Sequence, residues 1–140
     1  MTWIPPQSPY LLLQELYVPD QWKILVCCLL LNQTSRKQVD PMIGELFKRY
    51  PDAKAMAVAK EEVLHGFLKP LGLWKRRAIT LKRFSYEFLS GEWNTAKDLY
   101  GCGKYADDAW RIFCKGDWQD VEPNDHALNE YHDWITEEAA

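Results

Sequence analysis

The feature that most constrains this chain of 140 residues is an unbroken run of eight apolar residues, Ile24 to Leu31. Asp20 precedes the run and is typical of a helix cap, so the pattern predicts a helix over residues 21–31. Apolar side chains surround this helix instead of forming one stripe, as expected of a helix buried on all sides. The run is far shorter than the roughly 20 residues of a membrane span. The remaining chain must therefore fold around it.

The rest of the sequence predicts further short helices and almost no strands. Ser35 and Gln38 form a capping box that opens a helix running to Tyr50, in which apolar residues recur every three or four positions. Other signals predict a short helix capped by Asp52, a turn capped by Thr95, and helices over residues 60–68, 74–89, 105–114 and from near 125. We expect a compact all-α fold of about eight short helices, in one domain spanning residues 1–140.

Charge and cysteine usage limit the possible cofactors and partners. The net charge of -3 gives no overall nucleic-acid signature, so any DNA binding must depend on local charge. The cysteines lack the paired CxxC spacing of zinc and iron–sulfur sites, and no secretory signal is visible. We therefore expect no metal or other cofactor, and free thiols in a reducing compartment, at Cys27, Cys28, Cys102 and Cys114.

Two glycines one residue apart, Gly101 and Gly103, interrupt the helical pattern within LYGCGKYADDAWRIF. A helix, a Leu-x-Gly-x-Gly turn and a second helix form a helix-hairpin-helix pattern. Its main-chain N–H groups can point outward at the start of the second helix and bind a phosphate oxygen. A glycine C-cap followed by a second cap explains the same residues, so this pattern alone leaves both interpretations open.

Asp125 opens the last predicted helix, within VEPNDHALNEYHDW. An Asp directly before a helix is commonly a capping residue. A carboxylate at that position can also stabilise positive charge and hold a water molecule. Cleavage of an N-glycosidic bond through an oxocarbenium-like state requires both of these tasks.

The hairpin and Asp125 together resemble the helix-hairpin-helix DNA glycosylase superfamily, and more narrowly the glycosylase domains of the methyl-CpG-binding domain protein 4 family. Five segments resemble blocks of those domains in the same order: PPQSPYLLLQE, DQWKILVCCLLLNQTS, LKPLGLWKRRA, LYGCGKYADDAWRIFC and PNDHALNEYHDW. The resemblance implies a helix-hairpin-helix glycosylase fold without an iron–sulfur cluster. It also implies that the chain is the C-terminal catalytic domain of a longer protein.

Residue by residue, the resemblance implies that Asp125 is the catalytic carboxylate. Tyr105 would lie in the base pocket, where relatives with lyase activity place a lysine nucleophile; a phenol cannot form a Schiff base, so the implied enzyme is monofunctional. Gln14 would hydrogen-bond the flipped pyrimidine, and Leu73 would insert into the base stack. Without the resemblance, Gln14 is a polar residue on an amphipathic helix and Leu73 a loop leucine folded into the core.

A dense basic patch follows Leu73 directly and comprises Lys75, Arg76, Arg77, Lys82 and Arg83. A solvated helix face explains such a run at least as often as a DNA contact does. Beside an inserting loop, however, these residues can neutralise phosphates. We expect phosphate contacts from Lys75, Arg76, Arg77 and the hairpin glycines Gly101 and Gly103, and a phosphate contact or solvated charge at Lys104.

Two residues depart from the family pattern. Gln33 stands where an arginine is expected, at the contact that probes the gap or the opposite strand. Ala127 stands where a lysine is expected. These differences concern DNA affinity and discrimination of the opposite base more than the cleavage step.

The resemblance thus implies a nuclear, monomeric enzyme of base excision repair that acts on double-stranded DNA. It would release thymine or uracil from G:T or G:U mismatches in a CpG context. Three alternatives stay open at this level: a glycosylase with lyase activity, a non-catalytic DNA-binding module with the same hairpin, and a protein-binding helical module that uses its many tryptophans.

Overall fold

The computed structural model describes residues 3–139, and every regular element within that range is helical. The α-helices are α1 (Gln21–Leu31), α2 (Arg36–Arg49), α3 (Ala53–Ala57), α4 (Glu61–Leu68), α5 (Trp74–Ser90), α6 (Lys104–Trp110) and α7 (His126–Ala139). Short 3-10 helices cover Leu13–Tyr17 (η1), Lys69–Leu71, Ala96–Asp98 and Trp118–Asp120, and a π-helical turn, Arg111–Lys115, continues α6. The predicted all-α class is confirmed. Across residues 3–139, no helix combines the length and apolar character that a membrane span needs.

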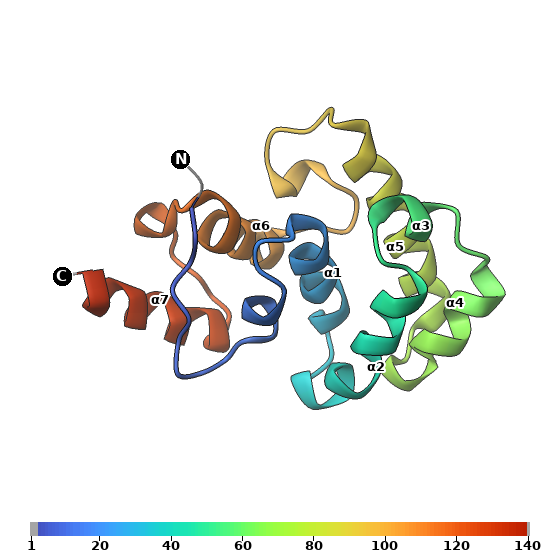
Figure 1. Cartoon of the computed structure of the whole chain (residues 1–140), viewed down its shortest axis with the longest axis horizontal. Helices are drawn as coiled ribbons and strands as arrows, with labels where there is room; N and C mark the ends of the chain where they lie inside the picture. Colours follow the sequence, from blue (N-terminus) through green and yellow to red (C-terminus); the bar gives the residue numbers. More distant parts are fainter. Residues whose placement is uncertain (1–2, 140) are drawn as a thin grey trace.

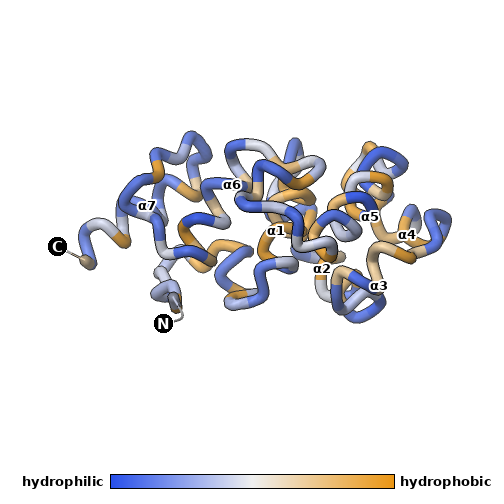
Figure 2. Tube along the Cα trace, turned by 90° about the horizontal axis from the view of Figure 1, so that it is seen from above, coloured by the Kyte–Doolittle hydropathy of each residue, from blue (hydrophilic) through white to orange (hydrophobic). Residues whose placement is uncertain are grey.

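Helix α1 occupies the centre of the molecule. Its residues 24–30 are all buried, and Leu29, the most accessible of them, is only 8% exposed. In Figure 1, α1 lies between the N-terminal segment with α6 and α7 on one side and α2–α5 on the other. Figure 2 gives the same order from a direction at right angles, with hydrophobic residues gathered around α1. The predicted central buried helix is confirmed.

The helix ends follow local signals that the sequence carries. Asp20 caps α1 by accepting a hydrogen bond from the Lys23 N–H at 2.9 Å. Ser35 and Gln38 form the predicted capping box at the start of α2. The predicted boundaries shift only slightly, since α4 begins one residue later, α5 ends one residue later, and α6 begins one residue earlier and passes into the π-helical turn.

The N-terminal segment, residues 3–12, runs beside α6 and α7 and leads into η1 (Figure 1). The indole N–H of Trp3 donates to the carbonyl of Ile112 at 2.8 Å, and the Tyr131 hydroxyl donates to the carbonyl of Pro6 at 2.6 Å. The Glu15 carboxylate accepts three hydrogen bonds, each of 2.7 Å, from the loop that precedes η1. These contacts hold the segment in place although it has little regular structure.

The two glycines of the hairpin before α6 differ in backbone conformation and in the space around them. Gly101 has a φ of +83°, and a Cβ there would lie 2.6 Å from Thr80 Cγ2. Gly103 is the N-cap of α6 with an extended backbone, and a Cβ there would meet nothing within 4 Å. The protein's own packing therefore requires glycine at position 101 and leaves open space at position 103.

Replacement of Leu25 tests the dependence of the fold on α1. Because Leu25 is fully buried, we expect Leu25→Ala to lower the free energy of unfolding by about 2–5 kcal/mol. Urea denaturation followed by circular dichroism measures this loss. Leu16→Ala, at a leucine of η1 that is 56% exposed, is the matched control and should change stability by less than about 0.5 kcal/mol. Similar losses in both variants would contradict the central role of α1.

The two hairpin glycines give a second stability test. We expect Gly101→Ala to cost more than about 1 kcal/mol, since the alanine is strained at positive φ and meets Thr80. Gly103→Ala should stay within about 1 kcal/mol of the parent protein, because its backbone and surroundings accept a methyl group. Thermal unfolding of the pair measures the difference. An equal loss of stability at both positions would show that neither the positive φ nor the contact with Thr80 explains the glycine at position 101.

Candidate active site

A cavity of about 450 Å³ opens where the chain leaves the core at the C-terminal end of α1. Its walls come from η1, the loop after α1, helix α6 and the first turn of α7. The structure therefore brings together residues from distant parts of the sequence. Among the residues that line it are five singled out by the sequence: Gln14, Gln33, Tyr105, Asp125 and Ala127.

Gln14 is 1% exposed and is fixed by its amide nitrogen. Nε2 donates to the Tyr105 hydroxyl oxygen at 2.6 Å and to Cys28 Sγ at 3.5 Å. The carboxamide has two N–H donors, and these contacts use both. Its carbonyl oxygen, Oε1, accepts no hydrogen bond from the described residues. Gln14 thus presents an acceptor to the cavity, and lies in the buried wall instead of on the surface of an amphipathic helix.

Tyr105 is half-buried and stays protonated. Burial raises the pKa of the phenol well above its ordinary value, and the neighbouring Cys28 adds to this shift. Burial also raises the pKa of the Cys28 thiol to about 12. Because the Tyr105 oxygen accepts its hydrogen bond from Gln14, its own O–H remains available as a donor. The cavity therefore offers one donor and one acceptor side by side.

Asp125 lies at the start of α7, at the edge of the cavity. Its Oδ2 accepts a hydrogen bond from the Leu128 N–H at 3.0 Å, so the capping role weighed from the sequence is confirmed. The second carboxylate oxygen, Oδ1, has no hydrogen-bond partner among residues 3–139, and the side chain is exposed. The cap fixes one oxygen and thereby holds the other in place for chemistry at the cavity.

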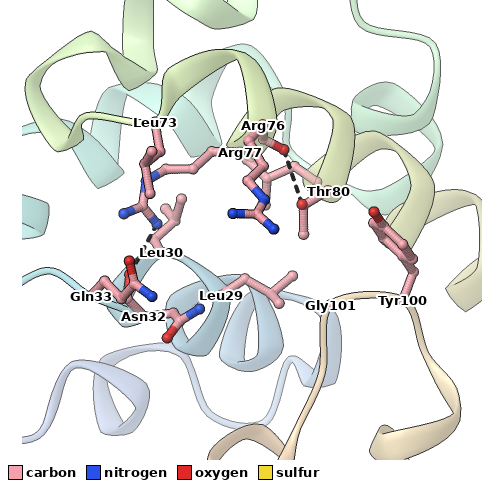
Figure 3. Close-up of a pocket in the computed structure, with 11 residues that line it drawn as sticks. Leu29, Leu30, Asn32, Gln33, Leu73, Arg76, Arg77, Thr80, Tyr100 and Gly101 are labelled. Atoms are coloured by element: carbon pink, nitrogen blue, oxygen red, sulfur yellow. Dashed lines mark hydrogen bonds between the residues drawn. The ribbon is translucent and has the colours of Figure 1, made fainter.

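A second cavity, of about 350 Å³, adjoins the first because Asn32 and Gln33 line both. Figure 3 shows that side chains from the start of α5 face the end of α1 across it, with the hairpin at the far side. The predicted inserting residue, part of the basic patch and one hairpin glycine thus meet at one cavity: Leu73, Arg76, Arg77 and Gly101.

Leu73 projects from the protein at the N-cap of α5. It is 53% exposed, so the alternative of a leucine folded into the core is wrong. Its φ is +48°, and that of the preceding Gly72 is +72°. Two other non-glycine residues between positions 3 and 139 have positive φ, Leu11 at +49° and Gln33 at +60°. Such backbone conformations are costly outside glycine. In this protein Gln33 lines both cavities and Leu73 lines the second. Leu11 directly precedes Leu12, which lines the first.

The predicted phosphate-binding cations have different surroundings. Arg76 is exposed and directs its guanidinium into the second cavity (Figure 3). Lys75 is exposed, with its ammonium 5.2 Å from the centre of the preceding indole ring. Lys104 Nζ donates to Asp108 Oδ2 at 2.6 Å and to a backbone carbonyl of the loop before α7 at 2.7 Å. Phosphate contacts by these residues and by the hairpin glycines stay predictions.

Arg77 is the predicted phosphate contact that the structure places inside the protein. It is 9% exposed, and burial lowers the pKa of its guanidinium. Its Nε donates to the Gly72 carbonyl at 2.9 Å and its Nη1 to the Asn32 carbonyl at 3.1 Å. Arg77 therefore joins the loop before α5 to the loop after α1.

Two residues that line the first cavity, Asn32 and Arg36, were not found from the sequence. The contact of Cys28 with Gln14 was not found either. Arg36 donates to the Leu11 carbonyl and, at 3.2 Å, to Asp40 Oδ1. No local sequence pattern predicts such contacts, because they join segments that are far apart in the chain. Over residues 3–139, no three His, Cys, Asp or Glu side chains form a group that could hold a metal ion, and the four cysteines are free.

Several known proteins are similar to this chain, among them two relatives and one solved structure. It is 48% identical over 134 residues to methyl-CpG-binding domain protein 4-like protein of Arabidopsis thaliana, across 96% of this chain and 30% of that protein. It is 35% identical over 94 residues to thymine/uracil-DNA glycosylase of Pyrobaculum aerophilum, across 62% of this chain and 41% of that protein. The chain thus spans less than half the length of either relative.

The solved structure of a thermostable thymine-DNA glycosylase matches 91% of this chain and 69% of its own, with a TM-score of 0.67 at 19% identity, which shows a shared fold. The family model described as HhH-GPD superfamily base excision DNA repair protein matches residues 26–132. That range holds residues 26–31 of α1, the hairpin, Tyr105 and Asp125 in the order described above. The chain therefore belongs to the HhH-GPD superfamily of base excision DNA repair proteins.

Proposed function

We propose that this chain is the catalytic domain of a monofunctional DNA glycosylase that releases thymine or uracil opposite guanine. The observation that carries this proposal is the first cavity, which Asp125 lines together with Gln14 and Tyr105. Within residues 3–139, one carboxylate oxygen of Asp125 has no hydrogen-bond partner. The names of the relatives from Arabidopsis and Pyrobaculum support a DNA substrate and a pyrimidine base.

The donor and acceptor in the cavity match the hydrogen-bonding edge of thymine and uracil. Both bases carry an N3–H donor between two carbonyl oxygens. Gln14 Oε1 can accept from N3–H while the Tyr105 hydroxyl donates to an adjacent carbonyl. Cytosine carries an acceptor at N3, which would face Oε1 without a hydrogen between them. A buried mismatch of this kind is strongly rejected, so the cavity favours thymine and uracil.

Hydrolysis then needs one carboxylate and one water molecule. The bond between C1′ and the base nitrogen breaks, its electron pair leaves with the base, and positive charge develops on the sugar. Asp125 stabilises this charge through its free oxygen and accepts a proton from the water that adds to C1′. The departing base takes up a proton and the hydroxyl from water stays on C1′, so the products are the free base and an abasic site. In this proposal Leu73 fills the space that the flipped base leaves in the duplex.

Asp125→Asn tests the catalytic role without removing the helix cap, since asparagine caps as well as aspartate. We expect the variant to keep its thermal stability and to lose about 10²–10⁴-fold in single-turnover base release. A G:T or G:U duplex is incubated with protein and treated with alkali, and strand breaks are counted. Wild-type levels of breaks in the variant would rule out this mechanism.

Salt-dependent DNA binding without base release by the parent protein would favour the non-catalytic module.

Borohydride trapping tests the monofunctional assignment. We expect no covalent protein–DNA adduct, because the residue in the cavity is Tyr105 and a phenol forms no Schiff base. Lys104 is adjacent in sequence, but one helical residue turns it by about 100°, and its ammonium is engaged by Asp108. Adducts are resolved on denaturing gels. An adduct in the parent protein that disappears in Lys104→Ala would establish the lyase alternative.

A further inference from the structure

Arg77 has two hydrogen bonds that reach loops about 40 residues apart in the chain. Its Nε donates to the Gly72 carbonyl at 2.9 Å, and its Nη1 donates to the Asn32 carbonyl at 3.1 Å. Figure 3 shows the side chain running from α5 toward the loop that follows α1. The two loops carry Leu73 and Gln33, which line the second cavity together.

No acidic side chain in the described range forms an ion pair with Arg77, although the residue is only 9% exposed. A buried guanidinium is normally paired with a carboxylate, because desolvation of an unpaired charge is costly. Here the compensation comes from two backbone carbonyls. The planar fork of arginine can reach both at once, whereas the single ammonium of lysine lacks that geometry.

Each carbonyl that Arg77 binds belongs to the residue directly before a left-handed residue. Gly72 precedes Leu73, whose φ is +48°, and Asn32 precedes Gln33, whose φ is +60°. A carbonyl and the following N–H share one rigid peptide plane. When Arg77 fixes the two planes, it limits rotation at the backbone bonds that orient Leu73 and Gln33.

We propose that Arg77 is a positioning residue that couples the Leu73 loop to the Gln33 loop. It holds the residue that fills the gap in the base stack and the residue that probes the opposite strand in one fixed relation, so both engage the duplex together. This inference rests on the proposed function. It also gives Arg77 a role distinct from that of its neighbour Arg76, whose guanidinium faces the open cavity.

Single-turnover kinetics on a G:T duplex test the proposal with Arg77→Met and Arg77→Lys. Because a small misplacement of positioned groups costs about 10²-fold in rate, we expect both variants to lose roughly tenfold to a hundredfold. Arg76→Met is the matched control on the same helix and should chiefly weaken DNA binding and its salt dependence. Full activity in Arg77→Lys would overturn the proposal, since charge alone would then suffice. A fall in the salt dependence of Arg77→Met equal to that of Arg76→Met would identify Arg77 as a phosphate contact instead.

A double-mutant cycle with Leu73→Ala separates positioning from a general loss of structure. If Arg77 acts by holding Leu73, the two changes should not add, and Arg77→Met should cost less than about threefold in the Leu73→Ala background. Independent, multiplicative losses would contradict the coupling. Thermal unfolding is measured for each protein; if Arg77→Met does not fold, the same cycle is carried out with Arg77→Lys.

Base extrusion can be followed without catalysis, which keeps this test separate from that of the proposed function. In the Asp125→Asn background, 2-aminopurine placed next to the mismatch should brighten on binding as Leu73 disrupts stacking. Adding Arg77→Met should remove most of that increase, whereas adding Arg76→Met should leave it in place at saturating protein. An unchanged increase with Arg77→Met would overturn the inference. If the parent protein releases no base but the fluorescence follows Arg77, only the proposed activity fails.

Discussion

Burial of α1 on all sides is the constraint on which the rest of the structure depends. Its side chains point in every direction, so η1, α6 and α5 must each cover part of it. Both cavities lie at the end of this helix, where the chain continues through Asn32 and Gln33, which line both. The position of the candidate site thus follows from where the buried helix stops.

Hydrogen bonds that stabilise the fold also prepare the candidate site. Asp125 caps α7 with one oxygen, and its other oxygen has no partner within the described part of the chain. Gln14 uses both of its donors inside the protein, and its acceptor has no partner in that part of the chain. Each side chain therefore has a fixed orientation before any ligand is bound, which lowers the cost of ordering it later. The capping and catalytic interpretations of Asp125 are compatible because they concern different atoms.

The sequence predicted the helix caps, which depend on neighbouring residues, and missed the contacts between distant residues, which depend on packing. Asp20, Ser35 and Asp52 cap helices as expected, since a cap acts over three residues of chain. The family resemblance indicated Gln14 and Tyr105, but their contact joins residues 91 positions apart and no periodicity could reveal it. Arg77 was predicted as a phosphate contact of the basic patch, and its burial was missed because charge in a sequence does not show which face of a helix is buried.

The left-handed backbone at Leu11, Gln33 and Leu73 has a consequence for how this protein can evolve or be engineered. Each of these residues carries a conformational cost of roughly 1 kcal/mol or more that glycine would relieve. Glycine would also remove the side chain and free the loop. At Gln33 and Leu73, thermostability and the proposed engagement of a duplex are thus opposed, and a search for stability alone would select against side chains that line the cavities.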